Sequence, residues 1–200
     1  MKKLTAEFYN RPEVLTIAKE LLGKIIVTRF DGVLTTARIV ETEAYRGVVD
    51  KASHAYGGRR TQRTEVMFGA AGKAYVYLCY GIHFLFNIVT NEAEIPEAVL
   101  IRGAEPLEGI PEMLKRTGKA KADFTLTRGP GNVSKALGID KIHTGYSLFS
   151  KDFYLAEDGY VPEKVVATPR IGVDYAGADA LLPYRFIVEG NRYVSGKRIV

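Results

Sequence analysis

The N-terminal part of the chain shows two spacings of apolar side chains, one typical of a helix and one typical of strands. Between residues 11 and 22 apolar residues recur at helical spacing, and Pro12 suits a first helical turn. Residues 24–30 alternate as a strand does, and the Asp31-Gly32 pair is a hairpin turn signal, so that the chain should pair back over the residues that follow. The apolar residues at helical spacing are Val14, Leu15, Ala18, Leu21 and Leu22.

The remainder of the chain alternates short strand and helix patterns, without an internal repeat or a linker. Residues 47–72 are polar, basic and rich in glycine, and a loop of this length in a compact domain is usually functional. Together these patterns predict one mixed domain over residues 1–200. The other expected elements are strands over 74–90 with a break at Tyr80-Gly81, a strand over 98–101 that ends in Arg102, a helix over 106–116, a short helix over 133–137 after Gly129-Pro130-Gly131, and further strands and turns over 148–200.

Acidic side chains stand in the expected strand around residues 39–45, where apolar ones would be less costly to bury. Because side chains alternate between the two faces of a strand, residues 39, 41, 43 and 45 should share one face. This face would hold Ile39, Glu41, Glu43 and Tyr45. Two carboxylates on a buried strand are expensive in free energy, so a functional site is one interpretation. The other interpretation is an edge strand with solvated glutamates.

Tyrosines mark the strands over residues 74–90. Alternation places Tyr75 and Tyr77 on one face, and Gly81 allows the chain to reverse soon after them. An aromatic side chain at an exposed tip suits insertion into a membrane interface or into the base stack of a nucleic acid. The alternative is an ordinary sheet with core tyrosines. The residues at the expected tip are Tyr80, Ile82 and His83.

The basic charge of the chain favours a polyanionic partner. Lysine and arginine outnumber aspartate and glutamate by 28 to 23, which gives a formal net charge of +5. Arg59, Arg60 and Arg63 fall in the polar loop around Thr61, and this composition suits phosphate contacts. Gly129-Pro130-Gly131 before a helix offers backbone N–H groups to an anion. Solvated loops and ordinary turns explain each signal alone, but together with the aromatic tip they predict a surface for double-stranded DNA.

Other classes of site are disfavoured by what the chain lacks. Its single cysteine, Cys79, excludes an internal disulfide and lies in an apolar run typical of a buried side chain. Three scattered histidines offer no zinc-ligand spacing, and no apolar run is long enough to span a membrane. We expect a cytoplasmic bacterial protein that needs no metal and no organic cofactor.

Glu43 and Arg102 indicate a reaction at the predicted DNA surface. A buried carboxylate can act as a general base on water, and Arg102 can order the same water. The corresponding reaction is hydrolysis of an N-glycosidic bond at a nucleotide pushed out of the base stack. Because no lysine is clearly placed for Schiff-base chemistry, water is the simpler nucleophile. A non-catalytic binder of distorted DNA and a hydrolase of free nucleosides are the alternatives.

A series of motifs in fixed order covers nearly the whole chain. They are Ile39–Tyr45, Asp50–His54, Met67-Phe68, Tyr75–Tyr77, Tyr80-Gly81, Asn87, Ala98–Arg102, Glu105-Pro106, Gly129–Gly131, Arg170–Val173 and the tail 183–195. In this order and spacing the chain resembles the alkyladenine (3-methyladenine) DNA glycosylase family. The resemblance implies a compact α+β domain with a curved antiparallel β-sheet, flanking helices and a protruding β-hairpin that inserts into DNA. It also implies a monofunctional base-excision repair glycosylase that flips out alkylated or deaminated purines and leaves an abasic site.

The resemblance further implies roles for individual residues. Glu43 would activate the water, and Arg102 with the backbone carbonyl of Ile171 would hold it. Tyr80 would fill the gap in the duplex, flanked by Ile82 and His83. The implied lining of the flipped-base pocket is Tyr45, His54, Tyr77, Asn87 and Ile171, with Asn87 where the amino group of an unmodified guanine would clash. The implied phosphate contacts are Arg59, Thr61, Arg63, Gly131 and Lys141.

The implied partner is double-stranded DNA with a damaged purine. The family likeness predicts a monomer without an obligate protein partner, a membrane contact or a cofactor, located at the bacterial nucleoid through DNA binding. Asn132 stands where the family often has lysine, and Ile82 and His83 stand where relatives often have methionine and an aromatic residue. These departures concern lesion preference and affinity rather than the reaction.

Overall fold

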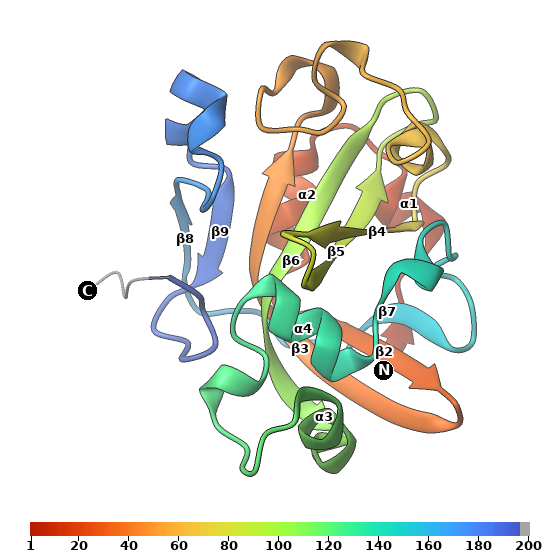
Figure 1. Cartoon of the computed structure of the whole chain (residues 1–200), viewed down its shortest axis with the longest axis vertical. Coiled ribbons are helices and arrows are strands. Elements are labelled where there is room, and N and C mark those ends of the chain that lie inside the picture. The colour runs from red at the N-terminus through yellow and green to blue at the C-terminus, as the bar shows by residue number, and fades with distance from the viewer. Residues whose placement is uncertain (197–200) are drawn as a thin grey trace.

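One nine-stranded sheet forms the centre of the computed structural model, which describes residues 1–196 (Figure 1). The strand order is β1-β7-β2-β3-β6-β5-β4, while β9 pairs with β3 and β8 pairs with β9. The described strand pairs are antiparallel. This sheet with its few helices confirms the predicted α+β class and the compact domain. The strands are β1 (Lys2–Lys3), β2 (Ile25–Phe30), β3 (Val33–Tyr45), β4 (Ala74–Cys79), β5 (His83–Thr90), β6 (Glu97–Glu108), β7 (Phe153–Glu157), β8 (Val165–Thr168) and β9 (Arg185–Val188).

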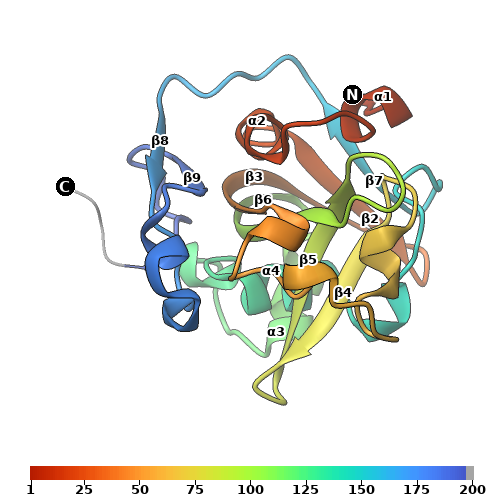
Figure 2. The same cartoon turned by 90° about the horizontal axis from the view of Figure 1, so that it is seen from above.

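Helices cover both faces of the sheet. Figure 2 shows α2 on one face and α3 and α4 on the opposite face. The Thr42 hydroxyl on β3 donates to the carbonyl of Ala18 in α2 at 2.8 Å, and the Thr28 hydroxyl on β2 donates to the carbonyl of Leu137 in α4 at 2.9 Å. The α-helices are α1 (Ala6–Tyr9), α2 (Val14–Glu20), α3 (Ile110–Thr117) and α4 (Pro130–Leu137). The short 3-10 segments are η1 (Gly47–Val49), η2 (Tyr56–Gly58), η3 (Glu65–Phe68), η4 (Phe124–Leu126), η5 (Lys141–His143) and η6 (Asp174–Leu181).

The longest strand, β3, is central rather than at an edge. Its first half pairs with β2 up to Arg38, and β9 takes the place of β2 from Glu41 to Glu43, while β6 pairs along the other side. Both glutamates are fully buried as a result. The alternative interpretation of this stretch as a solvated edge strand is therefore wrong.

A bulge in β3 changes the faces expected from simple alternation. Glu41 and Glu43 lie on the same side, since both contact Arg102. Ile39, however, packs in the main hydrophobic core together with Val40. The register between β3 and β6 shifts at this point, and an extra residue in one strand resets the alternation of its side chains. The prediction that Ile39 shares the face of the glutamates is therefore wrong.

The helix expected over residues 11–22 is shorter than predicted and is preceded by a separate helical turn. It runs over Val14–Glu20, and α1 lies before it. Pro12 and Glu13 separate the two, because Glu13 has a left-handed φ of 74° that a helix cannot continue through. Helix α4, by contrast, begins earlier than predicted, at Pro130.

The strand expected over residues 98–101 is much longer and runs over Glu97–Glu108 as β6. Arg102 therefore lies in the middle of a strand and not at its end. Pairing with β3 continues through the polar second half of β6, where the apolar pattern gave no signal. The helix expected over residues 106–116 consequently begins only at Ile110.

Candidate active site

Two carboxylates and one guanidinium are buried together at the centre of the sheet. Glu41 and Glu43 project from β3, and Arg102 on β6 contacts both, with Nε 3.3 Å from Glu41 Oε1 and Nη1 3.4 Å from Glu43 Oε2. Burial alone would lower the pKa of the Arg102 guanidinium, but Glu43 and Glu41 outweigh this effect and raise it. The structure thus brings the two predicted catalytic residues, Glu43 and Arg102, into contact.

Glu41 accepts four hydrogen bonds, three on Oε1 and one on Oε2. Its Oε1 accepts from Arg102 Nε, from Arg185 Nε at 2.6 Å and from the Ser195 hydroxyl at 2.9 Å. Its Oε2 accepts from the Ser195 backbone N–H at 2.7 Å. These four donors come from β6, from β9 and from Ser195, and three of them share Oε1. The role of Glu41 is to anchor the segment around Ser195 to β3.

Glu43 keeps one acceptor position open. Its Oε1 accepts from the Ile171 backbone N–H at 2.8 Å, and its Oε2 accepts from the Tyr45 hydroxyl at 2.9 Å and from Arg102 at 3.4 Å. Burial raises the pKa of the Glu43 carboxyl, although Arg102, the Ile171 N–H and the Tyr45 hydroxyl each act to lower it. A buried carboxylate with a raised pKa and a free lone pair has the properties of a general base.

A buried ion pair holds the loop that supplies the Ile171 N–H. The Arg170 guanidinium donates two hydrogen bonds to Asp50, at 2.6 and 2.9 Å, and both side chains are buried. The guanidinium carbon also lies 4.9 Å from the centroid of the Tyr45 ring. A bidentate buried pair has a defined geometry, so it fixes both Ile171 and Tyr45 in place around Glu43.

A cavity of about 340 Å³ adjoins this charge cluster. Arg102, Tyr45 and Ile171 line it, whereas Glu43 lies behind them and forms no part of its wall. The volume is in the usual range for a small-ligand site, about 300–1,000 Å³. The structure gathers all the predicted pocket residues around this one cavity. They are Tyr45, His54, Tyr77, Asn87 and Ile171.

Contacts among its own residues hold the aromatic part of the wall. The His54 ring meets Tyr77 edge to face, with centroids 4.7 Å apart, and its Nδ1 lies 2.8 Å from the Tyr75 hydroxyl. Arg63 reaches the same group, with Nη2 2.8 Å from His54 Nε2 and the guanidinium carbon 4.8 Å from the Tyr77 centroid. Burial, and then the charges of Arg63 and Arg59, lower the pKa of His54 to about 4. His54 is therefore uncharged at neutral pH.

Two further residues line the cavity, Asn87 as predicted and Cys79 against the prediction. Asn87 is buried, and its Nδ2 donates to the carbonyls of Tyr75 and Leu85 at 3.2 and 3.3 Å, so its orientation is fixed. Cys79 is half-buried and lines the cavity, so the prediction of a buried core side chain is wrong for it.

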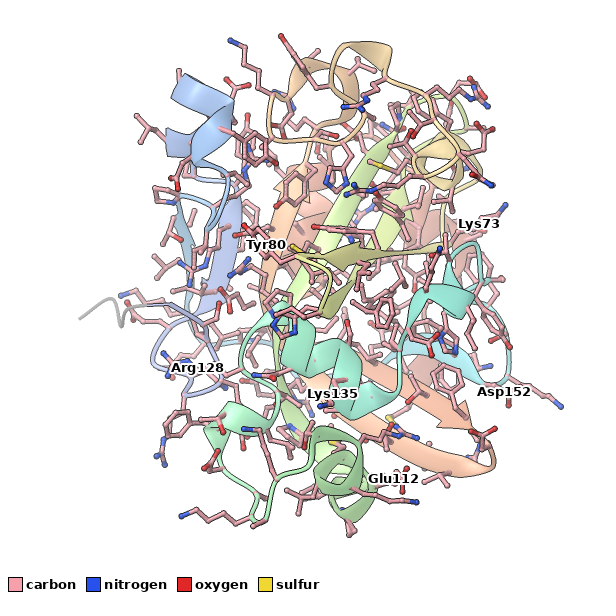
Figure 3. All side chains as sticks on the ribbon, in the orientation of Figure 1. Lys73, Tyr80, Glu112, Arg128, Lys135 and Asp152 are labelled. Carbon is pink, nitrogen blue, oxygen red and sulfur yellow. The ribbon has the colours of Figure 1, made fainter. Side chains whose placement is uncertain are left out.

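Two of the three predicted tip residues reach the first cavity. Tyr80 and His83 line it, and the side chains of Tyr80 and Ile82 are 87% and 73% exposed. Figure 3 shows Tyr80 at the free end of the β4–β5 hairpin. Its φ of 49° is left-handed, which is unusual for a residue other than glycine. The alternative interpretation of Tyr80 as a core residue is therefore wrong.

The five residues predicted to contact phosphate do not form one cluster. Three of them line a second cavity of about 490 Å³. Gly131 lines the first cavity against His83, and a Cβ on Gly131 would come within 2.8 Å of the His83 ring. Lys141 is exposed on η5 and lines neither cavity. The three residues at the second cavity are Arg59, Thr61 and Arg63.

Most of the side chains that hold the site in place carry no signal in the sequence. An arginine at the start of the apolar strand β9 signals a buried charge that needs a carboxylate partner, but the pattern does not say which carboxylate. Arg170 and Asp50 likewise lie inside recognised motifs without an assigned role. The missed residues are Arg185 and Ser195, which donate to Glu41, Asp50 and Arg170, which pair with each other, and Tyr175, which lines both cavities.

Within residues 1–196, no three His, Cys, Asp or Glu side chains are arranged to hold a metal ion. None of the helices described there has the length and apolar character needed to cross a membrane. The described wall of the first cavity contains no lysine.

Comparisons with known proteins agree on one family. The family model for methylpurine-DNA glycosylase matches residues 7–192. A protein of Desulfitobacterium hafniense, named provisionally as a 3-methyladenine DNA glycosylase, is 47% identical over 98% of this chain and 100% of its own length. Proteins with the same name from Clostridium perfringens strain SM101 and Bacillus thuringiensis are 43% and 45% identical, over 98% and 92% of this chain and 100% and 95% of their own lengths.

We expect Glu41→Gln to lower the free energy of unfolding by about 3–5 kcal/mol, because removing one partner of a buried ion pair leaves the guanidinium of Arg185 uncompensated and that of Arg102 with Glu43 alone. Glu43→Gln should cost much less, since the pKa of this carboxyl is already raised and an amide oxygen still accepts from the Ile171 N–H. Urea denaturation of both variants at neutral pH measures the difference. Equal losses, or a larger loss for Glu43→Gln, would contradict the assignment of Glu41 as the anchor.

Proposed function

The chain belongs to the methylpurine-DNA glycosylase family, and on this premise we propose that it hydrolyses damaged purines from double-stranded DNA with water activated by Glu43. As a family member it is a DNA glycosylase of base-excision repair that acts on alkylated bases of the 3-methyladenine type. The proposal adds that the enzyme is monofunctional and that it also removes deaminated purines of the hypoxanthine type. The observation that carries it is the open acceptor position of Glu43 beside an aromatic cavity.

The cavity suits a purine that has been flipped out of the duplex. Alkylation at a ring nitrogen gives the purine a positive charge, and the ring faces of Tyr45 and Tyr77 attract a cation. His54 is uncharged at neutral pH, so it does not repel such a base. The fixed amide of Asn87 would exclude an unmodified guanine through its exocyclic amino group.

The proposed reaction needs only one water molecule. The water oxygen bonds to C1′ of the deoxyribose as the C1′–N9 bond breaks, and the electron pair of that bond leaves with the base. Glu43 takes a proton from the water, and its charge stabilises the cation-like sugar. Arg102 and the carbonyl of Ile171 hold the water. A positively charged alkylated purine leaves as a neutral base, whereas hypoxanthine leaves as an anion and takes up a proton from solvent.

The hairpin and the basic residues account for the DNA partner. Tyr80, held out at the tip, would fill the gap that the flipped nucleotide leaves in the stack, with Ile82 and His83 beside it. Arg59, Thr61, Arg63, Gly131 and Lys141 would contact phosphates. We propose that the protein binds DNA as a monomer, without an obligate protein partner, and locates to the nucleoid for this reason.

Glu43→Gln should abolish base release while DNA binding holds or tightens. The change is nearly isosteric, removes the general base and takes away one negative charge, and loss of a general base alone costs ~10²–10⁴ in rate. Single-turnover release from a duplex with one methylated or hypoxanthine base, in the presence of a chelator, measures the rate. Release by Glu43→Gln at near the wild-type rate would contradict the assignment of Glu43 as the general base. If the wild type released no base from any lesion, the result would favour a non-catalytic DNA binder. Release from free nucleosides alone would favour a nucleoside hydrolase.

The rate of base release should depend on pH through Glu43. A general base must be ionised, so the rate falls as the pH drops through its pKa. Because burial raises the pKa of Glu43, the half-maximal rate should lie at a higher pH than the value near 4.3 of an ordinary glutamate. Single-turnover rates across pH, on protein shown to be folded, test this expectation.

Tyr80→Ala should weaken binding to lesion duplexes and slow excision while the melting temperature stays close to that of the wild type. The exposed ring contributes little to the core. Its proposed role is to fill the gap in the base stack, which offsets part of the few kcal/mol that unstacking a nucleotide costs. The defect should shrink when the lesion is mispaired, since such a base leaves the helix more easily. Tyr45→Ala is the comparison, because loss of pocket stacking should impair excision whatever the opposing base. An equal Tyr80→Ala defect with paired and mispaired lesions would argue against the wedge.

A further inference from the structure

The second cavity, of about 490 Å³, adjoins the first, which is called the base cavity below because it is proposed to hold the flipped base. The two have the wall residues Ser53, His54 and Tyr175 in common. Its wall comes from η6 and from the loop before η3, which lie near each other beyond the carboxyl end of β3 (Figure 1). The residues that line only the second cavity are Lys51, Tyr56, Arg59, Thr61, Arg63 and Thr64.

The charged side chains on the wall of the second cavity are basic. Lys51, Arg59 and Arg63 line it, and none of its described wall residues is acidic. Neither Lys51 nor Arg59 has an ion pair among residues 1–196. Arg60 in the same loop is different, because it pairs with Glu65 at 2.7 Å and Glu94 at 2.6 Å and lies outside the cavity. The wall therefore offers uncompensated cations to an anion.

Two tyrosines add an aromatic surface to the same wall. Tyr56 is 45% exposed and Tyr175 is 69% exposed. The Tyr175 hydroxyl donates to the Ala52 carbonyl at 3.0 Å, which holds the ring at the wall while most of it stays in solvent. Exposed aromatic rings beside free cations are typical of sites that stack an unpaired base and bind its phosphate.

We propose that the second cavity binds the nucleotide next to the flipped one on the damaged strand, with its phosphate on Lys51 and Arg59 and its base against Tyr56 and Tyr175. The inference rests on the proposed function. The two cavities share a wall, and a nucleotide held in the first is covalently joined to its neighbour. The neighbour is thus delivered to the second cavity without a separate binding event.

Binding of the neighbouring nucleotide would make substrate choice depend on how that nucleotide is paired. The neighbouring base must leave its own pair to reach the tyrosines, so a weak neighbouring pair should favour binding. A damaged purine beside a mismatch is then a better substrate than the same purine beside a normal pair, and the gain depends on residues that line only the second cavity.

The experiment measures single-turnover base release at increasing enzyme concentration. The duplexes carry one lesion, and the nucleotide on its 5′ or its 3′ side is paired, mispaired or replaced by an abasic analogue. For the wild type, a mispaired neighbour on one side should lower the half-saturating concentration about tenfold, as expected for one base stack. The abasic analogue should remove this gain.

Tyr56→Ala and Lys51→Ala test the wall, since neither residue lines the base cavity. Both should lose most of the gain from a mispaired neighbour while the lesion beside a normal pair is released within about twofold of the wild-type rate. Arg60→Ala is the matched control and should keep the full gain, because Arg60 is paired outside the cavity. The proposal is overturned if Tyr56→Ala keeps the gain, if Arg60→Ala loses it equally, or if the abasic neighbour binds as well as the mispaired base.

Failure of the proposed function would be seen separately. The wild type would then release no base even from the lesion beside a normal pair. Fluorescence anisotropy of the same duplexes still compares the three neighbours in that case, and equal affinities for all of them would reject the second cavity as a nucleotide site.

Discussion

The burial of two carboxylates in the central strand constrains this structure more than any other interaction. An ionised group out of water must meet donors, and the donors to Glu41 and Glu43 come from distant parts of the chain. Arg102 comes from β6, Arg185 from β9, and two more donors from Ser195. The C-terminal segment is thus held against the sheet by the need to satisfy charge, in addition to its apolar packing. The wall of the base cavity depends on this arrangement, because Arg102 is part of both.

Two glutamates on the same face of one strand acquire different properties from their surroundings. Glu41 accepts four hydrogen bonds and sits between two guanidiniums, so it holds distant parts of the chain together. Glu43 faces one guanidinium, a phenol and one backbone N–H, and burial raises its pKa. The bulge near Val40 allows this difference by turning β3 from its pairing with β2 to its pairing with β9. Environment, rather than residue type, separates the anchor from the candidate base.

Much of this arrangement could be predicted from the sequence because it depends on local patterns. The alternation around Glu43, the reversal at Gly81 and the exposed Tyr80 follow from period and turn chemistry, and the ordered motifs gave the family. What could not be predicted depends on pairs far apart in the chain. Asp50 and Arg170 meet across 120 positions, and nothing local in either segment names its partner. The prediction for the face of Ile39 was wrong for a related reason, since the apolar pattern does not show where a bulge lies.

In the loop of residues 47–72, a few cations that are unpaired among residues 1–196 are held in fixed positions, so a modest net charge can still favour binding at one surface. A net charge of +5 spread evenly would attract any polyanion weakly. Here Arg60 is neutralised by Glu65 and Glu94, and Arg63 is bound to His54, so the free cations that line the cavities are few and fixed in position. Arg63 also stacks on Tyr77 in the base cavity. If Arg63 contacts a phosphate as proposed, that contact would change the surroundings of His54 and Tyr77 and so couple the DNA backbone to the shape of the cavity through one side chain.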